Sequence, residues 1–242
     1  MERVLEYEGN PPLLMFDFDG VICNSLDALL PEVRVVFSEI GYNGLKTREE
    51  LMAVMDGNVF LKLAAAGFPM SKIKWLSKRF KPHLEKVYRT LNPFPGIVEV
   101  INIFSDFAPV YIVTGNRAGT VDEFCSRHGI TGIRDIIGSD IERSKVKSIK
   151  RIRKMHRDHS PYYIGDTLGD MREAGKAKVK RIGAAWGWHG RERLARAKPE
   201  YIVEKPEDLI DLFRDLSAAG GDSRLEGPMG RLKQNLKSLW GV

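Results

Sequence analysis

The sequence lacks the features that mark secreted and membrane-spanning proteins. It has two cysteines among 242 residues, Cys23 and Cys125, which are too few for a disulfide framework and lack metal-ligand spacing. No apolar run approaches the roughly 20 residues needed to cross a bilayer. The opening residues, MERVLEYEGN, contain no apolar signal-peptide core. We therefore expect a cytoplasmic protein with reduced thiols, in which Cys23 is a small apolar packing residue.

Histidine is also scarce, and charge is unevenly spread. The five histidines have neither metal-ligand spacing nor a nucleophile nearby, so we expect exposed helix or loop positions for His83, His128, His156, His159 and His189. The net charge is +6, and eight Lys or Arg fall between Glu142 and Arg157. A basic stretch can meet nucleic acid, an acidic membrane surface or an anionic substrate. It can equally be a solvated helix face, so charge alone does not decide between them.

Short apolar runs rich in β-favouring residues alternate with helical patterns along most of the chain. The predicted strands are 13–18, 109–113, 134–138, 161–164 and 179–184. The predicted helices between and after them are 95–107, 117–128, 144–157, 168–176 and about 206–216, with Ser144 as an N-cap. Such alternation predicts an α/β fold, a Rossmann-like parallel sheet with helices on both faces.

The segment 24–92 differs because it contains no convincing strand. It is typical of consecutive helices, at 25–40, 47–55, 58–66 and 71–91. Pro82 is expected to kink or split the last of these. We therefore predict a core formed by 1–23 and 93–216, with an all-helical domain, 24–92, inserted after the first strand.

The chain ends in a Gly/Ser-rich linker and a short amphipathic pattern, together 217–242. Leu232, Leu236, Leu239 and Trp240 share one helical face. Such a tail can lie on a membrane surface or a partner, although docking on its own domain or fraying is more common.

Polar side chains collect where the predicted strands end. Asp17 and Asp19 end the first strand, Thr114, Gly115 and Asn116 follow the second, and Asp166 and Asp170 follow the fourth. A lysine, Lys145 or Lys147, opens the helix before that fourth strand. Ligands of open α/β sheets bind at the carboxyl ends of the strands, so one cleft can hold all of these groups.

Converging carboxylates repel one another, and a divalent cation removes that repulsion. Oxygen ligands of this kind suit Mg²⁺, which binds through one or two carboxylates and phosphate oxygens. An ammonium group and a hydroxyl beside free backbone N–H groups suit the other phosphate oxygens. Metal, anion clamp and a carboxylate placed to attack are the parts that phosphoryl transfer requires.

These residues give the chain a resemblance to the haloacid dehalogenase superfamily of phosphohydrolases. The matching motifs are DFDGV, IVTGN, the helix-opening lysine and GDTLGD, in the family's order, and the resemblance runs from about 13 to 215. It implies that Asp17 is the nucleophile that forms an aspartyl-phosphate and that Asp19 is the general acid and base. It also implies that Mg²⁺ is held by Asp17, the backbone carbonyl of Asp19 and Asp166, with Asp170 ligating through water or orienting these ligands.

The same resemblance implies a phosphoryl-binding role for Thr114, its neighbours Gly115 and Asn116, and the lysine. Lys145 is favoured because Ile149 and Ile152, at +4 and +7, would pack on the sheet and turn Lys145 to the cleft. Lys147 remains the alternative.

The helical insert resembles the superfamily's C1-type cap, which implies a small phosphate ester as substrate. A cap loop that reaches the substrate would here contain Asp56, Gly57 and Asn58, unless this is an ordinary helix-helix turn. The segment 186–209 is similar to the last part of phosphoglycolate-phosphatase-like members, with a final short strand and a terminal helix.

We therefore expect a Mg²⁺-dependent phosphatase for a small phosphate monoester, phosphoglycolate-like or a sugar phosphate, as a monomer or homodimer. A phosphomutase with the same core residues is one alternative. A non-catalytic phosphate- or nucleic-acid-binding protein is another. No nucleic-acid partner is expected, because the basic helix contains no interleaved aromatic residue and the catalytic set is complete.

Overall fold

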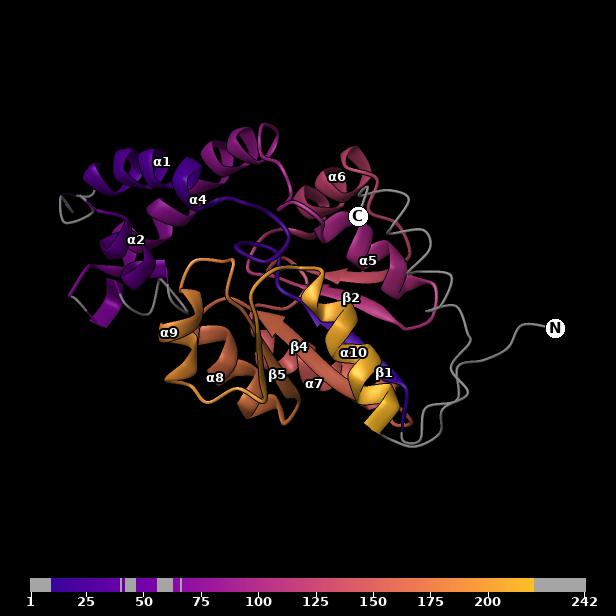
Figure 1. Ribbon diagram of the computed structural model, residues 1–242. Coiled ribbons are helices and arrows are strands. Elements are labelled where there is room, and N and C mark those ends of the chain that lie inside the picture. The colour runs from indigo at the N-terminus through magenta and orange to yellow at the C-terminus, as the bar shows by residue number, and fades with distance from the viewer. Residues whose placement is uncertain (1–9, 40, 42–46, 56–62, 66, 220–242) are drawn as a thin grey trace.

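The fold is built around one parallel sheet. In a computed structural model of the 242-residue chain, the structure describes residues 10–39, 41, 47–55, 63–65 and 67–219. Six strands run in the order β3-β2-β1-β4-β5-β6, and every neighbouring pair is parallel. Their bounds are β1 Pro12–Phe16, β2 Val110–Val113, β3 Ile133–Ile137, β4 Ser160–Gly165, β5 Lys180–Ala184 and β6 Tyr201–Val203. Strand β1 is central, so residues that follow β1, β2 and β4 share one edge of the sheet (Figure 1).

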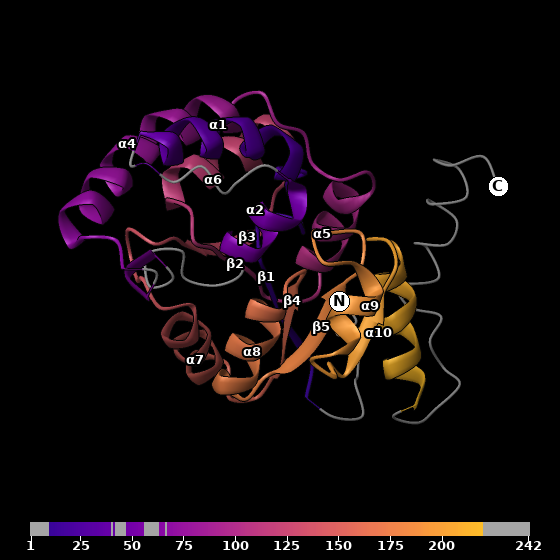
Figure 2. The same cartoon turned by 90° about the vertical axis from the view of Figure 1, so that its left-hand side faces the viewer.

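Helices cover both faces of the sheet, as the alternating pattern predicts. One face packs against α5 (Ile97–Ser105), α6 (Ala118–Arg127) and α10 (Asp208–Ala219), and the other against α7 (Lys145–Met155) and α8 (Leu168–Ala177). Alternate residues of β1 divide between these layers, since Leu14 and Phe16 enter the first core and Leu13 and Met15 the second. Figure 2 shows α7 and α8 on one side of the strands and α5 and α10 on the other. A short helix, α9 (Gly190–Ala195), lies between β5 and β6.

Three helices of the segment 24–92 lie together beside the carboxyl edge of the sheet (Figure 1): α1 (Leu26–Ser38), α2 (Arg48–Met55) and α4 (Met70–Tyr88). Residues 63–65 are also helical, whereas the rest of the predicted helix 58–66 and the loop residues Asp56, Gly57 and Asn58 fall outside the described residues. Buried residues of α1 and α4, including Val33 and Leu76, join the larger core cluster. The division of the chain into core, cap and tail stays a prediction.

Two local predictions differ from the structure. Of the kink or split expected at Pro82, the split is absent, because helix α4 continues without a break to Tyr88. A proline removes one backbone hydrogen bond, and the packing of Ile73, Leu76 and Tyr88 holds the turns on either side. Strand β1 ends at Phe16 rather than Phe18. Phe18 is fully buried, but its carbonyl accepts the backbone N–H groups of residues 21, 22 and 23 and so belongs to a turn.

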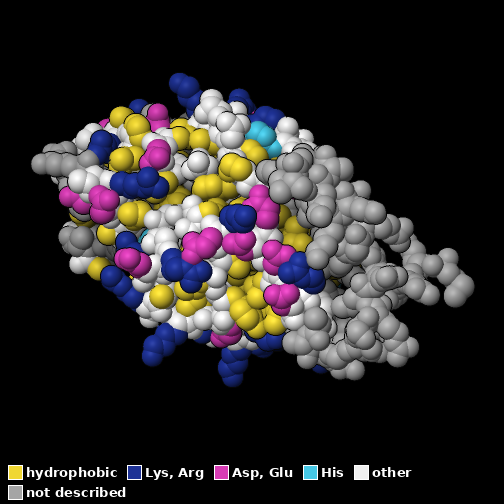
Figure 3. Space-filling view, in the orientation of Figure 1, with side chains coloured by type: hydrophobic (Ala, Val, Ile, Leu, Met, Phe, Trp, Pro, Cys, Tyr) yellow, Lys and Arg dark blue, Asp and Glu magenta, His cyan; other side chains and the backbone are white. Residues whose placement is uncertain are grey.

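The surface is relevant to two alternatives that the sequence leaves open, binding to a membrane and binding to nucleic acid. Among the described residues, no helix is long and apolar enough to cross a membrane. On the face drawn in Figure 3, basic and acidic side chains are interspersed rather than gathered in one basic patch. The amphipathic residues of the tail, 232–240, fall outside the described residues.

Candidate active site

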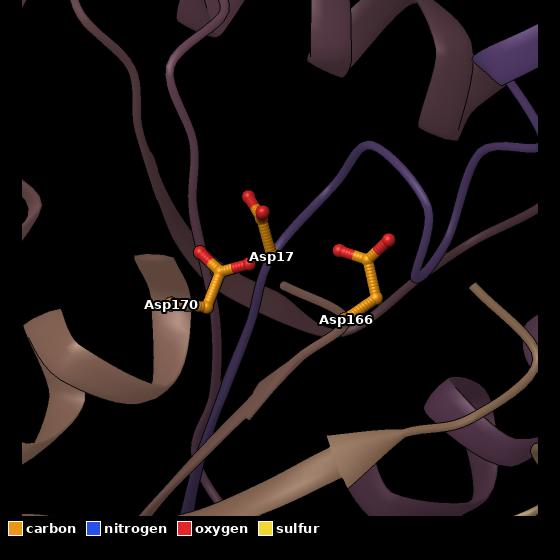
Figure 4. A group of neighbouring side chains, drawn as sticks. All are labelled: Asp17, Asp166 and Asp170. Atoms are coloured by element: carbon orange, nitrogen blue, oxygen red, sulfur yellow. The ribbon is translucent and has the colours of Figure 1, made fainter. Parts of the chain in front are cut away.

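Three aspartates meet at the carboxyl edge of the sheet (Figure 4). Asp17 directly follows β1, and its N–H donates to the Ile164 carbonyl at 2.9 Å, which extends the pairing of β1 with β4. Asp166 directly follows β4, and Asp170 lies in the first turn of α8. One carboxylate oxygen of each lies within 4.8 Å of the others, and all three side chains are buried.

Asp170 is fixed by the start of α8. Its N–H donates to the Thr167 hydroxyl, and its carboxylate accepts from the Thr167 N–H, which forms a capping box. The Thr167 hydroxyl also donates to Asp170 Oδ2 at 2.6 Å. One oxygen of Asp170 is therefore occupied by the helix cap, and the other is directed to the cluster.

Lys145 joins two of the aspartates. Its Nζ lies 2.9 Å from Asp17 Oδ2 and 2.8 Å from Asp170 Oδ1. It is the first residue of α7, whose Ile149 and Ile152 are fully buried against the sheet, and Ser144 caps the helix. Lys147 is exposed, so the structure brings Lys145 rather than Lys147 to the carboxylates.

The cluster brings three carboxylates together in a site buried from water, and Lys145 contacts two of them. Burial raises the pKa of Asp17 well above its usual value, with Lys145 opposing the shift. Burial, together with the charges of Asp170 and Asp17, raises the pKa of Asp166 well above its usual value. Burial alone would also raise the pKa of Asp170, but Lys145 and Thr167 outweigh it and the pKa is lowered. Lys145 therefore outweighs the effect of burial at Asp170, but only partly offsets it at Asp17 and Asp166.

The residues fit a small divalent cation in place of the missing positive charge. Asp166 Oδ1 is buried and has no hydrogen-bond partner among the described residues, while Oδ2 accepts from the Trp188 N–H at 2.7 Å. Gly20 has φ +73°, and a Cβ on it would lie 1.8 Å from Asp166 Oδ2. Only glycine leaves the carboxylate this room, and carboxylate oxygens are suitable ligands for hard divalent cations such as Mg²⁺.

Asp19 lies beside the cluster, and its hydrogen-bond donors Tyr88 and Asn116 are neutral side chains. The Tyr88 hydroxyl donates to its Oδ1 at 2.9 Å and its Oδ2 at 3.0 Å. Asn116 Nδ2 donates to Oδ2 at 2.6 Å. Burial raises the pKa of Asp19, and polar contacts with Ser25, Tyr88 and Asn116, together with the charge of Lys145, oppose the shift. A carboxyl group with a raised pKa, held by neutral donors, is suited to carry a proton at one stage of a reaction and release it at another.

The remaining predicted residues follow β2. Thr114 is buried, its N–H donates to the Ile137 carbonyl at 3.1 Å, and its hydroxyl accepts from the Asn116 N–H at 3.0 Å. A hydroxyl in this arrangement can still donate its own hydrogen to an anion. Gly115 is exposed, and a Cβ there would meet no atom within 4 Å. Asn116 thus contacts Asp19 directly, whereas Thr114 is connected to it through Asn116.

Three residues that help to hold the site, Tyr88, Trp188 and His189, were not predicted from the sequence. Tyr88 is the last residue of a long helix and carries no pattern of its own. Trp188 acts through its backbone N–H, which any residue would supply. His189, expected to be exposed, is buried, and its Nδ1 accepts the Leu168 N–H at 3.0 Å at the start of α8. A polar residue in the Trp-Gly stretch that follows a strand is the signal that could have located it.

Cys23 is a packing residue, as predicted. It is fully buried, and burial raises the pKa of its thiol far above the usual value. A thiol in this state is not a nucleophile at neutral pH.

Comparison with known proteins gives a consistent result. Residues 14–184 match the family model described as haloacid dehalogenase-like hydrolase. A phosphoglycolate phosphatase of Synechococcus elongatus is 22% identical over 208 residues, which cover 84% of this chain and 97% of that protein. The pyrophosphatase PpaX of Listeria monocytogenes is 21% identical over 220 residues, covering 86% of this chain and 98% of its own.

Solved structures show the same fold. A haloacid dehalogenase-like family hydrolase of Streptococcus pneumoniae superposes with a TM-score of 0.72 at 22% identity, covering 84% of this chain and 98% of that one. A predicted phosphatase of Clostridium acetobutylicum gives a TM-score of 0.75 at 17% identity, with 86% and 100% covered.

Proposed function

Because this chain belongs to the haloacid dehalogenase-like hydrolase family, we propose that it is a Mg²⁺-dependent phosphatase that hydrolyses a small phosphate monoester through an aspartyl-phosphate. The observation that carries the proposal is the difference between the surroundings of the two aspartates that follow β1. Asp17 lies beside Lys145 and two further aspartates, while Asp19 is held separately by Tyr88 and Asn116.

In the first step, Asp17 acts as the nucleophile. A carboxylate oxygen of Asp17 forms a bond to phosphorus, and the bond from phosphorus to the ester oxygen breaks. The electron pair of that bond stays on the leaving oxygen, which takes the proton of Asp19. Lys145 balances charge on the phosphoryl oxygens, and Thr114 with the neighbouring backbone N–H groups supplies further donors.

In the second step, Asp19 acts as the base. It takes a proton from water, the water oxygen bonds to phosphorus, and the acyl-phosphate bond breaks with its electron pair returning to Asp17. The residues that would hold Mg²⁺ are Asp17, Asp166, Asp170 and the backbone carbonyl of Asp19. When bound, Mg²⁺ supplies positive charge that neutralises the carboxylates and the phosphoryl oxygens.

The substrate is a small phosphate ester, and the helices of 24–92 act as the lid. These helices lie beside the carboxyl edge of the sheet (Figure 1), where they would exclude water and obstruct a macromolecular substrate. The names of the relatives, a phosphoglycolate phosphatase and a pyrophosphatase, support a compact phosphorylated compound, with phosphoglycolate and sugar phosphates as the first candidates.

The test is a screen of small phosphorylated compounds with inorganic phosphate as the readout, in Mg²⁺ and in EDTA. A radiolabelled substrate, quenched in acid during turnover, is expected to leave label on Asp17 that hydroxylamine removes. Absence of Mg²⁺-dependent phosphate release from every compound would overturn the proposal. Label passing to a second hydroxyl instead of to phosphate would identify a phosphomutase with the same core residues.

A further inference from the structure

Tyr88 reaches from the last turn of α4 to the carboxyl group of Asp19. Its hydroxyl lies 2.9 Å from Oδ1 and 3.0 Å from Oδ2. Tyr88 belongs to the helical segment 24–92, whereas Asp19 follows the first strand of the sheet. One hydroxyl therefore joins the two parts of the chain at the group that handles the proton.

The position of that hydroxyl is fixed by three independent contacts. The Tyr88 ring packs on Phe18, with ring centroids 5.7 Å apart. Its backbone carbonyl accepts from Arg127 at 2.8 Å. Asn116 Nδ2 lies 3.0 Å from the hydroxyl itself. A side chain held at its backbone, ring and hydroxyl loses little freedom when it orients another group.

The Asp19 carboxyl group meets donors on both of its oxygens. Asn116 donates to Oδ2 at 2.6 Å, and the Tyr88 hydroxyl lies within hydrogen-bond distance of Oδ1 and Oδ2. Tyr88 is the donor that comes from the helical segment 24–92, so it links the orientation of this carboxyl group to the position of α4.

We propose that Tyr88 is a positioning residue for proton transfer, because its hydroxyl holds the Asp19 carboxyl group in one orientation toward the leaving oxygen. The inference rests on the proposed function, in which Asp19 is the general acid. As the bond from phosphorus to the ester oxygen breaks, the electron pair on that oxygen takes the proton of Asp19, and Asp19 becomes a carboxylate with Tyr88 and Asn116 as donors. Helix α4 thereby sets the geometry of the acid as well as covering the cleft.

The dependence of rate on the leaving group separates this role from a structural one. A basic alkoxide needs its proton during bond breaking, whereas p-nitrophenolate leaves readily without one. In Tyr88→Phe, kcat/KM is expected to fall by about tenfold or more for alkyl phosphates and by less than about threefold for p-nitrophenyl phosphate. The slope of log kcat/KM against leaving-group basicity becomes steeper.

The chain offers a matched control and a double-mutant cycle. Tyr111→Phe removes a hydroxyl that bonds His156 Nε2 at 2.8 Å, away from Asp19, and is expected to leave the slope unchanged. In an Asp19→Asn background, Tyr88→Phe is expected to add no further loss, because the group that it orients is absent.

Each possible result bears either on the proposed function or on the role of Tyr88. A wild-type protein without Mg²⁺-dependent hydrolysis of any of these esters overturns the proposed function itself. With an active wild type, equal losses across the leaving groups, no loss at all, or an additive loss in Asp19→Asn overturns only the role of Tyr88. A Tyr88→Phe protein that fails to fold while Tyr111→Phe folds assigns Tyr88 to the core and overturns the inference as well.

Discussion

Two aspartates, two positions apart at the end of β1, occupy opposite environments. Asp17 belongs to a charged group with Asp166, Asp170 and Lys145, which we call the ionic half of the site. Asp19 belongs to a neutral, hydrogen-bonded group with Tyr88 and Asn116, the neutral half. The same side chain is therefore suited to attack phosphorus in one half and to move a proton in the other, because the neighbours differ.

The largest expected effect comes from replacing Asp17, the proposed nucleophile in the ionic half. Asp17→Asn keeps the size of the side chain and is expected to lower phosphatase kcat by more than about 10⁴-fold, because an amide does not form the acyl-phosphate. Phosphate release from p-nitrophenyl phosphate measures the loss, and circular dichroism checks the fold. Full Mg²⁺-dependent turnover by this variant would contradict the role of Asp17.

Lys145 tests whether the ionic half depends on one lysine or on general basic charge. Lys145→Met is expected to lower kcat/KM by about 10²-fold or more, because a buried cation beside the phosphoryl site is lost. Lys147→Met removes the same charge from an exposed position two residues along and is the matched control. Equal losses in both variants would show that the basic helix acts only through its overall charge.

Asp166 tests the uncompensated charge of the ionic half through stability. Its pKa is raised in the fold, so this carboxyl group binds a proton more readily in the metal-free folded protein than in the unfolded chain. The contribution of Asp166 to stability is then full below about pH 4, the pKa of an unfolded aspartate, and is lost as the pH rises through the raised pKa. Mg²⁺ at about 100 times its Kd should restore about 2.7 kcal/mol at neutral pH.

In Asp166→Asn, both the loss of stability between acidic and neutral pH and the gain from Mg²⁺ are expected to shrink. Thermal unfolding in EDTA and in Mg²⁺, across that pH range, measures both. A variant that keeps the wild-type response to Mg²⁺ would exclude Asp166 from the metal site.

The smallest expected effect tests whether the neutral half and the ionic half act separately. Asn116→Ala removes the 2.6 Å hydrogen bond to Asp19 and is expected to lower kcat/KM by about tenfold, the worth of one hydrogen bond to a charged group. The Mg²⁺ concentration for half-maximal activity should stay as in the wild type, because no ligand of the ionic half is touched. A shifted Mg²⁺ requirement would mean that the halves are one coupled network.

The ionic half could be predicted from the sequence, and the neutral half only in part. Asp17 and Asp166 follow from one rule, that the carboxyl ends of parallel strands share an edge, and the strands could be located from their apolar runs. Lys145 is favoured over Lys147 by the helical spacing of Ile149 and Ile152. Tyr88 could not be predicted, since its contact with Asp19 spans 69 residues and depends on how α4 packs. The buried turn at Phe18 was missed because burial, not strand pairing, explains its apolar side chain.

The contact between the loop after β5 and the loop after β1 has a consequence for biosynthesis. Trp186 Nε1 donates to the Val21 carbonyl at 3.0 Å, and the Trp188 N–H holds Asp166. Asp17 leaves the ribosome before Asp166 and Trp188, which come more than 140 residues later in the chain. A nascent chain therefore carries Asp17 without these partners until synthesis has passed residue 188, and the proposed activity would begin only after that point.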